Sequence, residues 1–144
     1  MSVHLLEQGF QPYQWLSEFE TQLPSGQHGA SASFIGTMRD FNDNESIQHM
    51  TLEHYPAMTQ RYLEQLEQRA EQQWPLNACL IVHRFGDIHI GDSIVLIGCW
   101  SAHRRAALDA CAWLIEELKF NAPFWKKEYR QHGTVWVSEN TSGN

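Results

Sequence analysis

Residues 93–120 read Ser-Ile-Val-Leu-Ile-Gly-Cys-Trp-Ser-Ala-His-Arg-Arg-Ala-Ala-Leu-Asp-Ala-Cys-Ala-Trp-Leu-Ile-Glu-Glu-Leu-Lys-Phe, and this stretch decides the fold. Its first eight residues are almost entirely apolar, which predicts a strand over 93–100. Apolar residues then recur at helical spacing over 104–120, and Pro123 ends that helix. The spacing predicts a buried helix face made of Leu108, Cys111, Leu114, Ile115 and Leu118.

The segments on either side mix helices and strands without strict alternation. The patterns predict helices over 12–23 and 56–74, and strands over 30–35, 47–55, 78–83 and 134–137. Glycines 86 and 91 indicate turns before the strand at 93–100. This order predicts one α+β domain with a mixed or antiparallel sheet and about three helices, rather than a doubly wound sheet. We expect the domain to span 1–138, with a flexible tail at 139–144.

Composition indicates a compact protein that does not enter a membrane. The 144 residues are 42% apolar and 19% charged, which is ordinary for one globular domain. No apolar run approaches the roughly 20 residues that a membrane helix requires. The N-terminus shows no basic segment followed by an apolar stretch, so we expect a cytoplasmic protein without a signal peptide.

The charges are distributed unevenly. The net charge of −7 argues against a nucleic-acid partner. Residues 101–130 nevertheless hold six Lys or Arg against four acidic residues, whereas the rest of the chain holds four against thirteen. A basic segment in an acidic protein suggests a small anionic ligand. By composition alone, a helix with a charged outer face fits equally well.

The cysteines and histidines do not indicate a metal site or a nucleophile. Cys79, Cys99 and Cys111 lie in apolar contexts without CxxC spacing, so we expect buried structural thiols. The eight histidines show neither HxH nor HExxH spacing, and we assign no metal and no cofactor. No nucleophile-elbow motif supports Ser/His/Asp catalysis.

All three lysines of the chain fall within nine residues, at Lys119, Lys126 and Lys127, around an expected Pro-aromatic turn at 123–125. Apolar surroundings lower the pKa of an ammonium group toward the range that acid–base catalysis needs. The alternative interpretation is structural. A cation such as Lys119 is favourable in the last turn of any helix, and a lysine stem packs readily against tryptophan.

A second basic group, His103-Arg104-Arg105, lies where the helix at 104–120 begins. Free backbone N–H groups at a helix start suit a phosphate or carboxylate, and guanidinium groups add charge-assisted hydrogen bonds. The alternative interpretation is that Arg104 and Arg105 simply face solvent and bind no ligand. Arg39, in a loop after the strand at 30–35, is a weaker candidate for binding.

Several segments together resemble a known family. They are Phe34-Ile35-Gly36-Thr37-Met38-Arg39-Asp40, Leu52-Glu53-His54-Tyr55 followed by Met58, His83-Arg84-Phe85-Gly86, Ala102-His103-Arg104, and Leu118-Lys119 through Pro123-Phe124-Trp125-Lys126-Lys127-Glu128. In this order and spacing, from about residue 4 to 136, the chain resembles the large, catalytic subunit of molybdopterin synthase. The resemblance implies an α/β-hammerhead-like fold.

The resemblance also implies a reaction. In that family, cyclic pyranopterin monophosphate receives two sulfurs and becomes the molybdopterin dithiolene of molybdenum cofactor biosynthesis. The sulfurs come from the C-terminal thiocarboxylate on the Gly-Gly tail of a small ubiquitin-like subunit. A homodimer of the large subunit forms a heterotetramer with this partner. By matching positions, the resemblance implies catalytic roles for Lys119 and Lys126 and substrate binding by Thr37, Met38, Arg39, His103, Arg104, Lys127 and Glu128.

Helix geometry adds an inference about assembly. Arg104 and Lys119 are fifteen residues apart on one expected helix, and therefore roughly 22 Å apart at about 1.5 Å per residue. If both serve one site, Arg104 comes from a second copy of the chain. Two other classes of function compete: a non-catalytic binding module for an anionic metabolite, and a scaffold for a ubiquitin-like partner.

Overall fold

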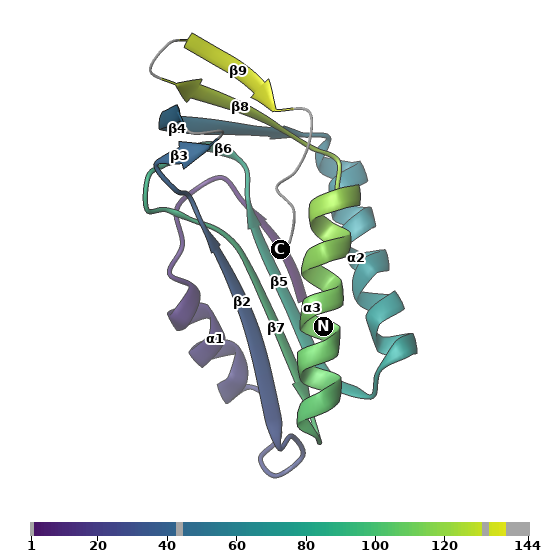
Figure 1. The fold of residues 1–144 in the computed structure, drawn as a ribbon. Helices are drawn as coiled ribbons and strands as arrows, with labels where there is room; N and C mark the ends of the chain where they lie inside the picture. The colour runs from purple at the N-terminus through teal and green to yellow at the C-terminus, as the bar shows by residue number, and fades with distance from the viewer. Residues whose placement is uncertain (1, 43–44, 131–132, 138–144) are drawn as a thin grey trace.

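The computed structural model describes residues 2–42, 45–130 and 133–137, and within these ranges the chain forms three helices and nine strands (Figure 1). In chain order they are β1 (Ser2–Leu6), α1 (Pro12–Thr21), β2 (Ala30–Thr37), β3 (Phe41–Asn42), β4 (Glu45–His54), α2 (Pro56–Gln73), β5 (Leu76–Arg84), β6 (Gly86–His89), β7 (Ser93–Ser101), α3 (Arg104–Asn121), β8 (Phe124–Arg130) and β9 (Gly133–Val137). The expected tail at 139–144 lies outside the described residues. No helix in the described ranges has the length and apolar character to cross a membrane.

The larger sheet has the strand order β1-β5-β7-β2. β1 runs parallel to β5, while β5 and β2 both run antiparallel to β7, so the sheet is mixed as predicted. Helix α1 covers one face of this sheet, and α2 and α3 cover the other (Figure 1).

The two central strands are apolar because both of their faces are buried. Ile81 and Ile97 belong to the core beneath α2 and α3. Leu80 and Leu96, each one residue away, belong to the core beneath α1. All four are fully buried, and each contributes about 1.5–3 kcal/mol relative to an exposed position. Burial on both faces explains why these strands read as continuous apolar runs rather than as an alternation.

The smaller sheet lies at one end of the larger one, beyond the C-terminal end of α3 (Figure 1). Its strand order is β3-β4-β8-β9, and β6 also pairs with β4. A separate small core lies beneath it, made of Met38, Ile47, Met50, Leu52 and Ile88. The junction between the two sheets therefore has its own packing, distinct from the cores beneath the helices.

Three expectations about local structure are wrong or incomplete. The segment after Pro123 is not a turn but strand β8, which pairs with β4 and β9. Leu108 is 52% exposed, because α3 buries only the face that carries Ala107, Ala110, Cys111 and Leu114. Strand β1 was not expected, and β6 forms where only turn glycines were expected; their partners β5 and β4 are distant in sequence.

Candidate functional site

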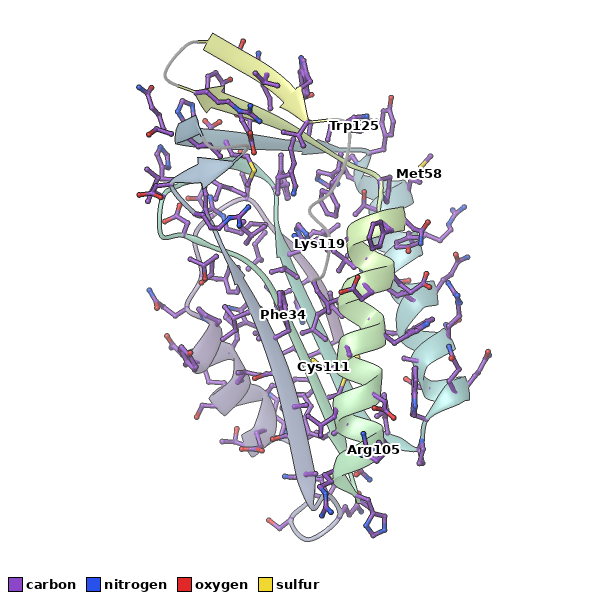
Figure 2. All side chains as sticks on the ribbon, in the orientation of Figure 1. Phe34, Met58, Arg105, Cys111, Lys119 and Trp125 are labelled. Atoms are coloured by element: carbon purple, nitrogen blue, oxygen red, sulfur yellow. The ribbon has the colours of Figure 1, made fainter. Side chains whose placement is uncertain are left out.

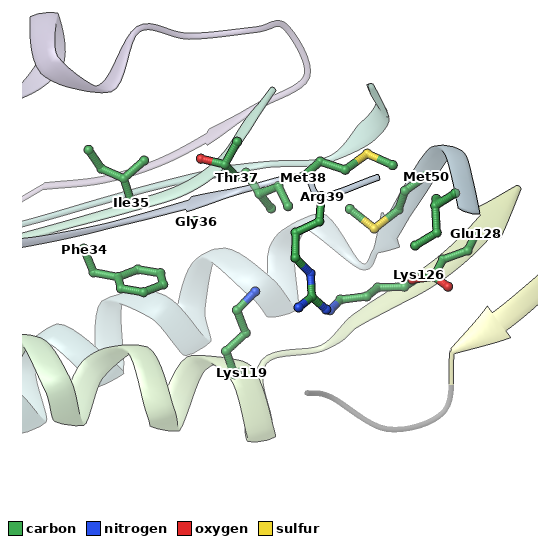
Figure 3. Close-up of a pocket in the computed structure, with 12 residues that line it drawn as sticks. Phe34, Ile35, Gly36, Thr37, Met38, Arg39, Met50, Lys119, Lys126 and Glu128 are labelled. Atoms are coloured by element: carbon green, nitrogen blue, oxygen red, sulfur yellow. The ribbon is translucent and has the colours of Figure 1, made fainter. Parts of the chain in front are cut away.

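A cavity of about 350 Å³ opens at the junction of the two sheets and the end of α3 (Figure 3). Five elements and one loop contribute to its wall. The lining residues are Phe34, Ile35, Gly36 and Thr37 of β2, Met38 and Arg39 of the following loop, Ile47 and Met50 of β4, Ile94 of β7, Lys119 of α3, and Lys126 and Glu128 of β8. Its volume and mixed lining are typical of a small-molecule site.

Two lysines face each other across this cavity. Lys119 lies in the last turn of α3, and Lys126 lies on β8 just past the proline that separates the two elements. Burial, and then the charge of Lys126, lower the pKa of Lys119 to about 8. Burial also lowers the pKa of Lys126, while Glu128 opposes that effect and Arg39 adds to it. At neutral pH most of Lys119 is therefore still an ammonium group, and a substantial share of it becomes neutral amine only in mildly alkaline solution.

Arg39 joins the two lysines to form a cationic wall of the cavity, beside the buried carboxylate of Glu128. Figure 3 shows the side chains of Arg39, Lys119 and Lys126 pointing toward one another. Glu128 is 4% exposed and accepts hydrogen bonds of 2.9 and 2.6 Å from the guanidinium of Arg130. Three cationic side chains that converge on one opening favour an anionic ligand, because their summed positive potential attracts negative charge.

A smaller inner cavity of about 30 Å³ lies behind the lysine pair. It is lined by Leu52, His83, Ile94, Leu118, Lys119, Ala122, Phe124 and Lys126. His83 is buried, stacks on the ring of Phe124 at 4.1 Å, and hydrogen-bonds the carbonyl of Arg84 through Nδ1 at 2.7 Å. Burial lowers the pKa of His83 to about 3, and its imidazole is therefore neutral.

Backbone pairing holds the loop with Met38 and Arg39 at the cavity. The Met38 N–H donates to the carbonyl of Asp92 at 2.9 Å, and the Gly91 N–H donates to the carbonyl of Met38 at 3.0 Å. Nearby, the pairing of β2 with β7 skips Ile94, a β-bulge that leaves this residue without a partner on β2. Bulges redirect side chains beside functional sites, and Ile94 lines both cavities.

The structure brings some of the expected site residues together and separates others. Thr37, Met38, Arg39, Lys119, Lys126 and Glu128 all line the larger cavity. Lys127 lies on the opposite face of β8, with Nζ 5.5 Å from the ring centroids of Tyr129 and Trp136. His103 and Arg104 are exposed at the first turn of α3, at the far end of the helix from Lys119; Figure 2 labels Arg105 and Lys119 at these two ends.

Sequence reasoning missed part of the site. The apolar wall residues Met50 and Ile94 carry no local signal, because only the approach of the two sheets brings them to the cavity. His83 did carry one, since a histidine at the end of the apolar run 78–83 is expected to be buried and hydrogen-bonded. The three cysteines are free and buried as expected, away from both cavities.

Comparisons with known proteins give a consistent result. A family model described as MoaE protein matches residues 9–121. The molybdopterin synthase catalytic subunit of Pseudomonas aeruginosa is 42% identical over 142 residues, covering 99% of this chain and 93% of that protein. The crystal structure of molybdopterin synthase from Staphylococcus aureus matches with a TM-score of 0.84 at 30% identity, over 94% of this chain and 96% of that one.

A third similarity concerns the fold alone. A complex of subunits 1 and 2 of the molybdopterin-converting factor from Helicobacter pylori matches with a TM-score of 0.79 at 24% identity, over 95% of this chain and 90% of that chain.

Proposed function

The chain belongs to the MoaE protein family, the catalytic subunits of molybdopterin synthase, and we propose that Lys119 and Lys126 carry its sulfur-transfer chemistry. It is an enzyme, a sulfurtransferase of molybdenum cofactor biosynthesis, and family membership decides against a non-catalytic binding module. The observation that carries the proposed roles is the convergence of two partly buried ammonium groups on one cavity beside Glu128.

The proposed donor is the C-terminal thiocarboxylate on the Gly-Gly tail of a small ubiquitin-like subunit, and the acceptor is cyclic pyranopterin monophosphate. The described part of the cavity lining supports a donor from outside, since the residues described there include neither cysteine nor serine. Each transfer forms one carbon–sulfur bond on the pterin side chain, breaks a carbon–oxygen bond at the same carbon, and breaks the carbon–sulfur bond of the thiocarboxylate. One of the two departing oxygens stays on the phosphate when the cyclic ester opens, and the other leaves as water. Water supplies the oxygen that replaces the sulfur, so the partner leaves as a carboxylate.

The two lysines have different proposed roles. Lys119 orients the thiocarboxylate and stabilises the anion released from it, as a preorganised cation does for a developing negative charge. Lys126 transfers protons to and from the pterin side chain as the cyclic phosphate opens. Arg39, which faces both lysines in Figure 3, holds the phosphate, and Thr37, Met38 and Glu128 complete the substrate site.

His103 and Arg104 enter this proposal through a second copy of the chain. Fifteen residues of α3 separate Arg104 from Lys119, roughly 22 Å at about 1.5 Å per residue, so one substrate cannot contact both within one chain. We therefore propose a homodimer whose junction completes each site, within a heterotetramer that includes two small subunits. Lys127 lies on the outer face of β8 and is left out of the substrate site of its own chain.

The assembly can be tested by subunit complementation. Arg104→Ala and Lys119→Ala chains, each inactive alone, are expected to recover partial activity when mixed, because one site of each hybrid dimer has both groups intact. No recovery in hybrids verified by mass spectrometry would refute the shared site.

The reaction is tested by incubating the protein with thiocarboxylated small subunit and the cyclic pyranopterin, followed by an assay for dithiolene product. Lys119→Ala is expected to abolish turnover and change substrate affinity only a few fold. Arg61→Ala, at an exposed position of α2, is the matched control and is expected to keep full activity. Product formation by Lys119→Ala at the normal rate would overturn the proposed role.

We assign the reaction to the cytoplasm, where the free thiols of Cys79, Cys99 and Cys111 stay reduced.

A further inference from the structure

His83 contributes the third polar side chain of the inner cavity, beside Lys119 and Lys126. The other five lining residues are apolar: Leu52, Ile94, Leu118, Ala122 and Phe124. A buried polar group needs a hydrogen-bond partner, and among the described side chains that line this cavity these three are the polar ones; a water molecule in the cavity is a further source. The mechanism proposed above gives His83 no role.

The hydrogen bond at Nδ1 determines what the other ring nitrogen can do. The carbonyl of Arg84 can only accept, so at 2.7 Å the Nδ1 of His83 must carry the proton and donate it. In a neutral ring the remaining nitrogen, Nε2, is then an acceptor.

The surroundings keep the ring of His83 in this state. Burial, followed by the nearby charges of Lys119, Lys126 and His54, lowers the pKa of His83 to about 3, although the bond to Arg84 opposes this effect. Stacking on Phe124, with an interplanar angle of 15°, restrains the orientation of the ring. The acceptor at Nε2 is therefore present throughout the neutral pH range.

We propose that His83 is a positioning residue for the lysine pair: its Nε2 accepts a hydrogen bond from one water molecule in the inner cavity, and that water accepts N–H bonds from Lys119 and Lys126. A volume of about 30 Å³ is sufficient for one water. Three hydrogen bonds are the usual number for a buried water. The common acceptor offsets the repulsion between the two ammonium groups and keeps both directed at the larger cavity. This inference rests on the catalytic roles proposed for the two lysines.

Two substitutions separate the acceptor from the rest of the imidazole. His83→Asn can still donate to the carbonyl of Arg84 but has no polar atom at the position of Nε2. His83→Gln can present an amide oxygen near that position but loses the donor at Nδ1. Because the chain has only three lysines, protein labelled with ¹³C and ¹⁵N in lysine gives three side-chain titrations, assigned with Lys→Arg variants.

The loss of a hydrogen bond to an ammonium group removes stabilisation of its charged form. In His83→Asn we expect the pKa of Lys119 to fall by about one unit, equivalent to a tenfold change in its protonation equilibrium. The same variant is expected to lower kcat about tenfold with little change in KM, because the lysines lose their orientation rather than the substrate its binding groups. His83→Gln is expected to restore both values most of the way.

The proposal fails if His83→Asn leaves the titrations of both lysines unchanged, or if the Asn and Gln variants change them equally. A second test of the proposal uses the unsubstituted protein. ¹⁵N shifts of histidine-labelled protein should report a neutral ring protonated at Nδ1 from pH 5 to pH 9, and a ring protonated at Nε2 would refute it even if a variant failed to fold. None of these spectra requires turnover, so a failure of the proposed reaction would be seen separately in the dithiolene assay.

Discussion

Replacement of Lys119 by methionine should stabilise the fold while it removes activity. Folding places this ammonium in a partly buried cavity beside a second lysine, and its pKa falls from 10.5 to about 8. At about 1.36 kcal/mol per pKa unit, this change corresponds to roughly 3 kcal/mol of destabilisation when the lysine is charged. We therefore expect Lys119→Met to raise the free energy of unfolding at pH 7 by about 3 kcal/mol.

The pH dependence of this stability difference shows whether the charge of Lys119 causes it. Below about pH 8 Lys119 is protonated in both states, and the full destabilisation is present. Between pH 8 and pH 10.5 the unfolded chain binds more protons than the folded one, so the stability of the unsubstituted protein rises with pH. By linkage, only about a quarter of the destabilisation remains at pH 10. The advantage of the methionine variant should therefore shrink strongly between pH 7 and pH 10.

Urea unfolding at these two pH values measures the effect, with Lys127→Met as the matched control. Lys127 lies outside the cavity and contacts the rings of Tyr129 and Trp136. Its replacement should lower stability by up to about 1 kcal/mol, the usual size of an exposed cation–π contact. The reasoning is refuted if Lys119→Met is less stable than the unsubstituted protein at pH 7, or if its advantage is undiminished at pH 10.

Two further changes test the packing of the helices. Leu114→Ala, in the core beneath α3, should lower the free energy of unfolding by about 2–5 kcal/mol. Leu108→Ala, on the exposed face of the same helix, should change it by less than about 0.5 kcal/mol. Equal losses of stability in chemical denaturation would contradict the observed buried face of α3. Glu67 is buried, accepts a 3.1 Å hydrogen bond from the Ser2 N–H, and has a pKa raised by burial to about 7. Since the folded state then binds more protons between pH 4.5 and pH 7, stability should fall as pH rises through this range, and Glu67→Gln should flatten the profile of unfolding free energy against pH.

The sequence by itself determined the elements whose pattern is local. The apolar run at 93–100 and the helical spacing at 104–120 correspond to β7 and α3, because continuous burial and a 3.6-residue period leave clear signals in composition. The lysine cluster and the motifs around it were sufficient to indicate the family, since they combine residue types that a solvated surface would scatter.

Only the tertiary structure decided how those residues are used. Segment 124–130 shows no clean alternation because one face of β8 lines a polar cavity, so its extended conformation depends on pairing with β4 and β9. That pairing directs Lys126 inward and Lys127 outward, a choice that a change of one residue in register would reverse. Likewise, Met50 and Ile94 join the site through contacts between segments far apart in the chain, which no local pattern records.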